Sequence, residues 1–416
     1  MESSLGGYGL YYRTPLIAFG VVAGAGTMLG DEPIPIDVIR DSPRATNLAV
    51  KMREAIAGTQ YYRQWMTTEN AIPTDVIDEF AEAVCLCRLD QHEMERDAIR
   101  AAIFEEDPRP DGQPIELADR GVQQRRLSVA HYLTLVRDTP AVVDAETAYR
   151  DALWSPANIH GGLHEMTAGQ WAALIAKDVW QEALCSVWSE FCRTGLALTR
   201  STDADLAWHE VKELAENLFT GHPETLRDRL TQNLAANLSV TTMPGASDNT
   251  VQVNVTDARL DELRLYTRHS DTAASGLIVL LELSRRAKRM TGRGWGEALL
   301  VGSAWQPSMA AVFVALDAHL ATDPTIGATL WWLVSRFVLP VHENIAYSKL
   351  PEFTFRFRWE EGLLHFYDTG IGRFPLSSIR REPLASLTQD LGFWERLNGI
   401  PSLTAYGRRF IQDVLG

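Results

Sequence analysis

Apolar residues recur at helical spacing over most of the chain, from about residue 42 to about residue 350. Ser42-Pro43 is typical of a helix start, because a proline in the first turn has no amide hydrogen to leave without a partner. The longest amphipathic run follows the helical period of about 3.6 residues and passes through Trp171, Leu174, Ile175, Leu184, Trp188 and Phe191. The pattern predicts a mainly α protein with a multi-helix body.

Polar residues that can cap helices mark where several of these helices begin. Capping boxes are predicted at residues 90–93 (DQHE) and 167–170 (TAGQ), where a short polar side chain and an acid or amide three residues later can bond each other's backbone. Further helices are expected to begin near residues 74, 119 and 144 and to span 203–219, 223–238, 271–290, 307–320 and 325–346.

Two stretches interrupt the helical pattern and divide the chain. Residues 1–40 are rich in Gly and Pro, and the Pro-Ile-Pro run at 33–35 forbids a regular helix, so this segment is expected to be irregular. In residues 239–256 a polar loop leads into three valines that alternate as in a short strand. We therefore expect four parts: the irregular segment 1–40, a helical domain 41–240, a second helical region 257–345 and a C-terminal module 346–416.

The C-terminal module has a different pattern from the body. Phe353, Phe355 and Phe357 alternate with polar residues, Glu361-Gly362 supplies a turn, and apolar residues then alternate again. This arrangement predicts a β-hairpin. A helix is expected at about 377–391, so the module should be a small α+β unit.

The end of this module resembles the end of a winged-helix domain. The resemblance consists of a helix that ends in Leu-Gly, a short turn and the pattern L-T-x-x-G-R-x-F, and its residues are Leu387, Leu391, Gly392, Leu403, Thr404, Gly407, Arg408 and Phe410. The resemblance covers about 30 residues, and its largest extent is the last 75 residues of the chain. Winged helices bind DNA in many families and dock proteins in others, so the resemblance implies one of these two roles.

The negative charge of the chain lies in the body. Residues 331–416 hold 10 basic and 9 acidic side chains, whereas the first 330 residues hold 29 and 45 and carry a net charge of −16. An acidic body repels phosphate backbones and anionic membrane surfaces, so any contact with nucleic acid must be local. The composition, 46% apolar and 22% charged, excludes a wholly disordered chain.

The four cysteines and the length of the apolar runs bear on the compartment. No CxxC motif occurs, which argues against a zinc site built from thiolates, and free thiols in a reducing environment fit the spacings best. No run reaches the roughly 20 apolar residues of a membrane span. We therefore expect a cytoplasmic, bacterial-type protein with no membrane contact.

Two groups of basic residues are candidates for contact with nucleic acid. The first lies in a stretch without acids, residues 284–296, at the end of an expected helix, where cations also favour the helix dipole. The second lies in the C-terminal module, where each residue would attract phosphate without reading sequence. Both groups also fit solvated surface positions. Their members are Arg285, Arg286, Lys288, Arg289 and Arg293 in the first group and Arg380, Arg381, Arg408 and Arg409 in the second.

A short His-rich segment is the weak candidate for a metal site. His160, His164 and Glu165 lie within six residues and supply ligand types that transition metals accept. Their spacing matches no standard hydrolase motif, and the segment also fits a Gly-rich loop before a helix. No metal or other cofactor is therefore assigned.

The absence of familiar catalytic motifs shapes the functional hypothesis. Neither a GxSxG nucleophile elbow nor a GxxxxGK[ST] phosphate loop occurs. The sequence favours a non-enzymatic component of an intracellular multi-protein assembly that docks a partner protein or DNA through its C-terminal module. A prokaryotic defence system is one setting for such a component. The alternatives are a winged-helix regulator that binds nucleic acid and a metal-dependent enzyme that uses the His/Glu cluster.

Overall fold

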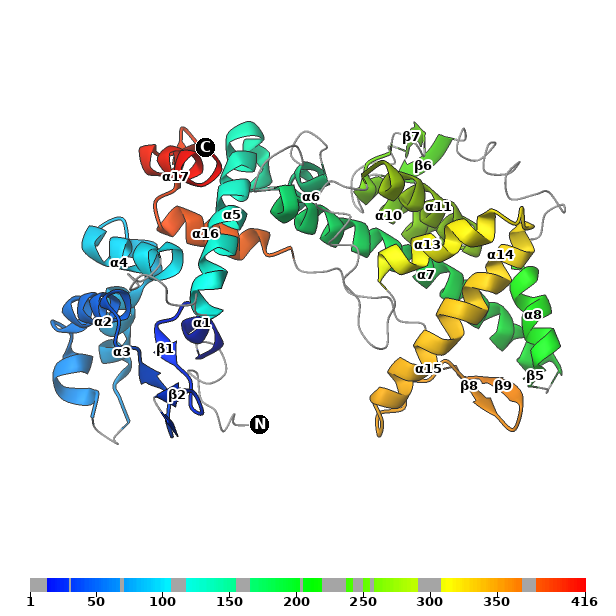
Figure 1. Cartoon of the computed structure of the whole chain (residues 1–416), viewed down its shortest axis with the longest axis horizontal. Helices are drawn as coiled ribbons and strands as arrows, with labels where there is room; N and C mark the ends of the chain where they lie inside the picture. The colour runs from blue at the N-terminus through cyan, green and yellow to red at the C-terminus, as the bar shows by residue number, and fades with distance from the viewer. Residues whose placement is uncertain are drawn as a thin grey trace. The chain divides into compact units, whose positions relative to one another are not determined.

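The computed structural model describes residues 13–29, 31–67, 71–105, 117–154, 165–202, 205–218, 237–241, 250–254, 258–290, 308–368 and 379–416. The protein is mainly α-helical, as predicted, with small antiparallel sheets (Figure 1). Its contacts group the chain into two compact units. Unit 1 comprises residues 1–145 and 380–416, and unit 2 comprises residues 146–379.

Unit 1 is discontinuous in sequence, because the last 37 residues pack with the first 145. Its N-terminal part begins with helix α1 and four two-residue strands, so the segment expected to be irregular contains a short helix. The elements of this part are α1 (Arg13–Ala18), β1 (Val22–Ala23), β2 (Met28–Leu29), β3 (Glu32–Pro33), β4 (Val38–Ile39), α2 (Pro43–Ile56), α3 (Thr74–Val84), α4 (Glu93–Phe104) and α5 (Leu117–Asp138). A π-helical turn (Tyr61–Trp65) and two 3-10 turns (Leu86–Arg88 and Pro140–Val142) connect them.

The C-terminal part of unit 1 is a helix, a hairpin and a helix. It consists of α16 (Arg381–Asp390), β10 (Trp394–Leu397), β11 (Ile400–Leu403) and α17 (Ala405–Leu415). From here on, the C-terminal module means residues 380–416, in place of the range 346–416 expected from the sequence. They pack against α5, mainly through α17 and β11. The boundaries expected from the sequence, near residues 240 and 346, do not coincide with this division, because the chain returns to unit 1 only at residue 380.

Unit 2 is organised around α7, a helix of 38 residues that packs along α11 and α10 (Figure 1). The strands that the structure describes in unit 2 form a hairpin of β6 with β7 and a three-stranded sheet in the order β5-β9-β8. The elements of unit 2 are α6 (Glu146–Trp154), α7 (Glu165–Thr202), β5 (Leu206–Ala207), α8 (Trp208–Glu216), β6 (Asn237–Thr241), β7 (Thr250–Asn254), α10 (Leu260–Ser270), α11 (Ala273–Met290), α13 (Met309–Leu320), α14 (Ile326–Leu333), α15 (Leu339–Ser348), β8 (Phe357–Glu360) and β9 (Leu363–Phe366). A π-helical turn, Val334–Val338, joins α14 to α15.

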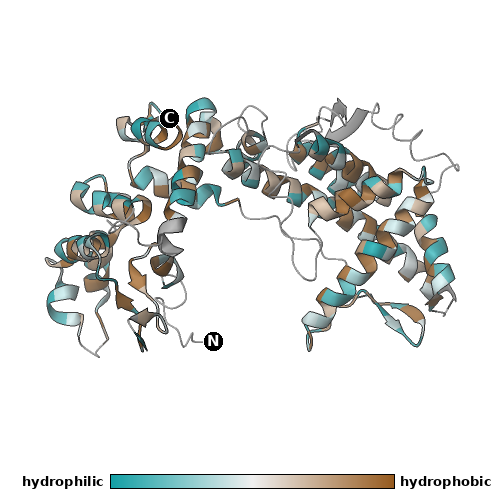
Figure 2. Cartoon of the chain, in the orientation of Figure 1, coloured by the Kyte–Doolittle hydropathy of each residue, from teal (hydrophilic) through white to brown (hydrophobic). Residues whose placement is uncertain are grey.

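Several predicted helix starts and the predicted hairpin are confirmed. The Ser42 side chain accepts a hydrogen bond from the amide of Ala45 at the start of α2. The hairpin β8–β9 turns at Glu361 and Gly362, which both have positive φ. Apolar and polar residues alternate along the helices of both units, as expected of amphipathic helices (Figure 2).

Other local predictions are wrong. Helix α4 begins after His92, whose side chain makes no capping bond, and α7 begins two residues before Thr167. The helix expected over 223–238 does not reach residue 238, because β6 begins at Asn237. Cys85 is disulfide-bonded, which differs from the expected free thiol, whereas Cys185 and Cys192 are buried and form no disulfide.

Among the residues that the structure describes, no helix combines the length and the apolar character needed to cross a membrane.

Candidate interaction surface of the C-terminal module

The turn between β10 and β11 is fixed by its two residues. Asn398 and Gly399 have φ values of 53° and 81°. A two-residue hairpin turn with both central residues in the left-handed region matches the right-handed twist of the flanking strands, and Asn-Gly is the pair that favours it. This stretch was predicted only as a short turn, although the Asn-Gly dipeptide is the signal for a hairpin.

The tip of the hairpin presents two apolar side chains to solvent. Leu397 and Ile400 pair directly across the turn, and they are 53% and 58% exposed. At the other end of the same strand, Trp394 is only 1% exposed. Its indole Nε1 donates to the Thr388 hydroxyl of α16 at 2.9 Å. The base of the hairpin is therefore fixed in the core, while its tip is apolar and uncovered.

Three positions of the winged-helix-like pattern have a role in local packing. The Thr404 hydroxyl accepts from the Gly407 amide at 3.1 Å and so caps α17, and it lies 2.8 Å from the carbonyl oxygen of Gly392. A Cβ on Gly407 would lie 2.0 Å from the carbonyl oxygen of Phe393, so only glycine fits there. Gly392 has a φ of 69° and ends α16 in the left-handed conformation.

The module is anchored to α4 by an arginine and by aromatic rings. Arg100 Nε donates to the carbonyl oxygen of Leu391 at 2.7 Å, and its guanidinium lies 3.7 Å from the centre of the Tyr406 ring. Phe104 of α4 packs edge-on against Phe393 and Phe410, with ring centres 5.5 and 5.2 Å apart. Burial lowers the pKa of Arg100, which the nearby Tyr406 and Asp97 oppose.

Other arginines of unit 1 bind the carbonyl oxygens at the end of α4. Arg125 Nε donates to Ile103 at 2.9 Å and Arg126 donates to Phe104 at 3.4 Å. Arg44 donates to the carbonyl oxygen of Glu105. The last carbonyls of a helix have no partner within the helix, and cations are favoured at this end. These arginines therefore stabilise the end of α4.

The four basic candidates of the C-terminal module differ in how they are used. Arg381 donates to the carbonyl oxygen of Val143 and to the Glu382 carboxylate. Arg408 donates to the carbonyl oxygen of Leu403. Arg380, Arg408 and Arg409 are exposed. Two of the four candidates thus bind atoms of their own unit, and three of the four, Arg408 among them, face solvent.

The other basic candidates lie in unit 2, at the end of α11. Arg285 and Arg286 both donate to the Glu282 carboxylate, at 2.7 and 2.6 Å, and Glu282 is fully buried. Lys288 forms an ion pair with Asp317 at 2.7 Å. The side chain of Arg289 and the whole of Arg293 lie outside the described residues. The positive charge of this stretch is therefore opposed by acids one helical turn away and on α13.

The metal candidate can be placed only in part. His160 and His164 lie outside the described residues, and Glu165 is the first residue of α7. Within the described part of the chain, no group of three or more His, Cys, Asp or Glu side chains is arranged to hold a metal ion.

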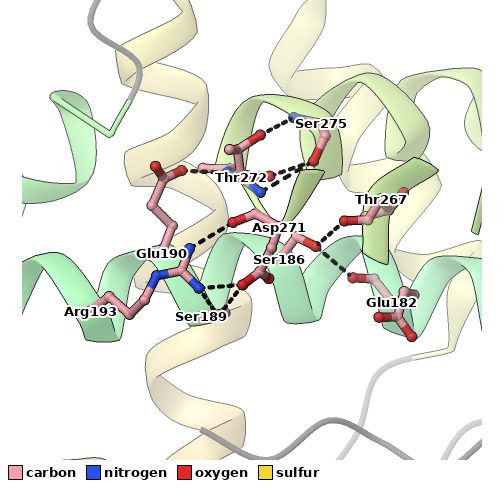
Figure 3. Close-up of polar contacts among 10 residues, drawn as sticks. Glu182, Ser186, Ser189, Glu190, Arg193, Thr267, Asp271, Thr272 and Ser275 are labelled. Atoms are coloured by element: carbon pink, nitrogen blue, oxygen red, sulfur yellow. Dashed lines mark hydrogen bonds and ion pairs between the residues drawn. The ribbon is translucent and has the colours of Figure 1, made fainter. Parts of the chain in front are cut away.

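A partly buried polar network joins the corner between α10 and α11 to α7 (Figure 3). Arg193 donates to the carboxylate and the carbonyl of Asp271, which ends α10 in the left-handed conformation. The Glu190 carboxylate accepts from the Ala273 amide at the start of α11, where negative charge is favoured. The Ser186 hydroxyl donates to the carbonyl oxygen of Thr267 at 3.1 Å. These groups satisfy one another and fix the helices, so we assign them a structural role.

A buried ion pair lies nearer the start of α7 than the polar network does. Arg150 of α6 and Asp178 of α7 are 2.7 Å apart, and their side chains are 3% and 1% exposed. Glu146 adds a second carboxylate at 2.9 Å from Arg150. Burial of this ion pair requires that both partners be present, because either charge alone would be desolvated without compensation.

A scan against protein-family models gave no match, and searches of curated proteins and of solved structures gave none either. The resemblance to a winged-helix domain therefore stays a prediction.

Proposed function

We propose that the chain is a non-enzymatic component of a protein assembly and that it docks a partner protein through the tip of the β10–β11 hairpin. The observation that carries the proposal is the pair of exposed apolar side chains, Leu397 and Ile400, on a hairpin whose base is fixed by buried Trp394. Solvent-exposed apolar side chains on a rigid element suit protein contact, since the element loses little conformational freedom on binding.

The use of the arginines favours a protein partner over DNA. Arg381 and Arg408 bind carbonyl oxygens within unit 1, and Arg285 and Arg286 bind buried Glu282. These bonds hold the guanidinium groups within their own unit and leave fewer of their five N–H donors for phosphate. Among the candidates that the structure describes, Arg380, Arg408 and Arg409 are exposed and have no described ion pair, and three phosphate contacts support only weak binding.

A photo-crosslinking side chain at exposed Glu395 of β10 tests the docking surface in the full chain. We expect covalent capture of a discrete partner in the native host, and no capture when the same side chain is placed at exposed Glu352 of unit 2. The double variant Leu397→Asp/Ile400→Asp should abolish capture from position 395. Equal capture from both positions, or capture that survives the double variant, would contradict the proposal.

A gel-shift assay at low salt separates the nucleic-acid alternative. If full-length protein retards duplex DNA, and Arg380→Gln/Arg409→Gln removes the shift while Leu397→Asp/Ile400→Asp does not, then the module binds DNA. The full chain is needed, because the module packs on α4 and α5. A role in prokaryotic defence remains a prediction that no described residue supports.

A further inference from the structure

Three tryptophans from distant parts of unit 2 meet at its surface. Trp208 begins α8, Trp331 lies in α14 and Trp359 lies in β8. The Trp208 ring centre is 4.9 Å from that of Trp331 and 5.2 Å from that of Trp359. We call these three residues the tryptophan cluster. Trp208 is 51% exposed, so the cluster offers a large aromatic surface to solvent.

Buried contacts hold the cluster in place. Trp359 lies two residues after fully buried Phe357 in β8, so the two side chains lie on the same face of the sheet. Leu206 of β5, two residues before Trp208, pairs with buried Leu364 of β9. Helix α14 approaches the end of α8 so closely that a Cβ on Gly327 would lie 2.8 Å from the Glu216 carbonyl oxygen. The exposed ring is thus set on a rigid base, which lowers the entropic cost of binding.

Two of the three segments that carry the cluster are strongly acidic. Residues 205–216 and 357–368 together hold seven acids and two bases. Both bases already pair with acids, Lys212 with Glu216 at 3.7 Å and Arg358 with Glu360 at 3.1 Å. Unit 2 as a whole holds 20 basic and 27 acidic residues, a net charge of −7. The field around the cluster therefore attracts cations.

Two carboxylates lie directly beside the cluster. Glu210 accepts from the amide of Ala207, which precedes Trp208, at 2.7 Å. Glu343 of α15 accepts from the amide of Trp359 at 3.1 Å. Each carboxylate uses one oxygen in the bond described, and a carboxylate has further acceptor positions. Negative groups are therefore placed beside the backbone of two of the three segments that carry the rings.

We propose that the tryptophan cluster binds a basic segment of a partner protein, with an arginine or lysine side chain over the Trp208 ring and further cations paired with the surrounding carboxylates. Tryptophan is the aromatic side chain that attracts cations most strongly. Charge complementarity selects this occupant, because an acidic rim repels nucleic acid and anionic lipid. The site is separate from the hairpin tip and does not depend on the function proposed for it.

The test uses full-length protein and a fluorescent seven-residue peptide that alternates Gly with Arg, compared with a peptide that carries norleucine in place of Arg. We expect the Arg peptide to bind and the norleucine peptide to bind at least tenfold more weakly. Trp208→Ala should weaken binding of the Arg peptide by about tenfold, and Trp208→Phe by less, because phenylalanine keeps an aromatic face. Circular dichroism checks that the variants are folded, as expected for a half-exposed side chain.

The matched control is Val314→Ala, which shortens another exposed apolar side chain of unit 2 without altering charge. It should bind the Arg peptide as the wild type does. Binding by Trp208→Ala that equals the wild type would overturn the proposal, since attraction would then come from diffuse negative charge alone. Equal binding of both peptides would overturn it too, because the site would then be apolar without cation preference. Failure of the wild type to bind the Arg peptide would have the same consequence.

Discussion

Unit 1 and unit 2 differ in the buried groups that accept from their arginines, although unit 1 also pairs arginines with exposed acids, as Arg100 with Asp97. In unit 1, Arg100 and Arg125 donate to carbonyl oxygens at the ends of α16 and α4. In unit 2, Arg150 and Arg286 donate to the buried carboxylates of Asp178 and Glu282. A carbonyl oxygen satisfies the donor but leaves the positive charge, whereas a carboxylate cancels it. The number of arginines in a stretch of sequence therefore does not measure the charge available to a partner.

The comparison also concerns how each interior is held together. The C-terminal module of unit 1 depends on aromatic rings and on one close backbone contact at Gly407. The α6–α7 contact of unit 2 depends on an ion pair that solvent hardly reaches. The α6–α7 contact of unit 2 should therefore be sensitive to the loss of a single charge, and the C-terminal module of unit 1 to the addition of a single methyl group.

The largest effect is expected from Arg150→Met. This change leaves Asp178 buried without its described cation, and removal of one partner of a buried ion pair costs about 3–5 kcal/mol. Urea denaturation followed by hydrogen exchange of the α7 amides measures the loss in unit 2. The double variant Arg150→Met/Asp178→Leu should recover much of the lost free energy of unfolding.

The control is Arg137→Met, which breaks an exposed pair with Asp138 and should change the free energy of unfolding by less than about 0.5 kcal/mol. A double variant no more stable than Arg150→Met would show that the charge is not the cause.

A somewhat smaller effect is expected from Gly407→Ala in unit 1. The new Cβ would lie 2.0 Å from the Phe393 carbonyl oxygen, and because that atom is backbone, α17 must move away from the hairpin. We expect a loss of about 3 kcal/mol, the upper part of the range for overpacking, seen as earlier unfolding of α17 in hydrogen exchange. Gly58→Ala is the control, since nothing lies within 4 Å of its added Cβ. A stable Gly407→Ala variant would refute the close contact.

The smallest effect is expected from pH. Burial, with help from Arg356 and Lys349, lowers the pKa of His342 in unit 2 to about 4, whereas it is near 6.5 in an unfolded chain. The unfolded chain therefore takes up the proton first as the pH falls. The contribution of His342 is complete above about pH 6.5 and decreases between about pH 6.5 and about pH 4.

His342→Gln isolates this contribution. Glutamine keeps an acceptor for the Arg356 amide, which His342 Nε2 accepts at 3.0 Å, but it does not titrate. Urea denaturation of unit 2 at several values between pH 7 and pH 4 should give a flatter pH dependence for the variant than for the wild type. Identical slopes would show that His342 is not the titrating group. Unit 1 should be unaffected by the substitution.

Local signals in the sequence predicted much of the helical structure but not its grouping. The Ser42 cap and the Glu361-Gly362 turn depend on neighbouring residues, and both are confirmed. That residues 380–416 pack with the first 145 depends on contacts between positions far apart in the chain, which one sequence does not reveal. The boundary expected near residue 346 came from charge and hairpin pattern, and neither reports on packing partners.

The candidate sites were harder to predict for a related reason. Arg285 and Arg286 formed a group without acids between residues 284 and 296, yet Glu282 lies three and four residues before them, within one helical turn. Glu282 lies just outside the acid-free stretch 284–296, so the stretch alone does not show that both arginines have an acidic partner. Leu397 and Ile400 were missed because the Asn-Gly turn between them was not recognised, and the tryptophan cluster combines residues from three separate segments.

The return of the chain to unit 1 has a consequence for protein synthesis. Helix α4 and the Phe104 ring are made early, but Phe393, Tyr406 and Phe410, which cover that ring and Arg100, leave the ribosome only after all of unit 2. Unit 2 is a single continuous stretch of the sequence, so it can fold before the last residues of unit 1 have been synthesised. During that interval the apolar face of α4 is open, and a chaperone that protects nascent chains would have its clearest binding site there.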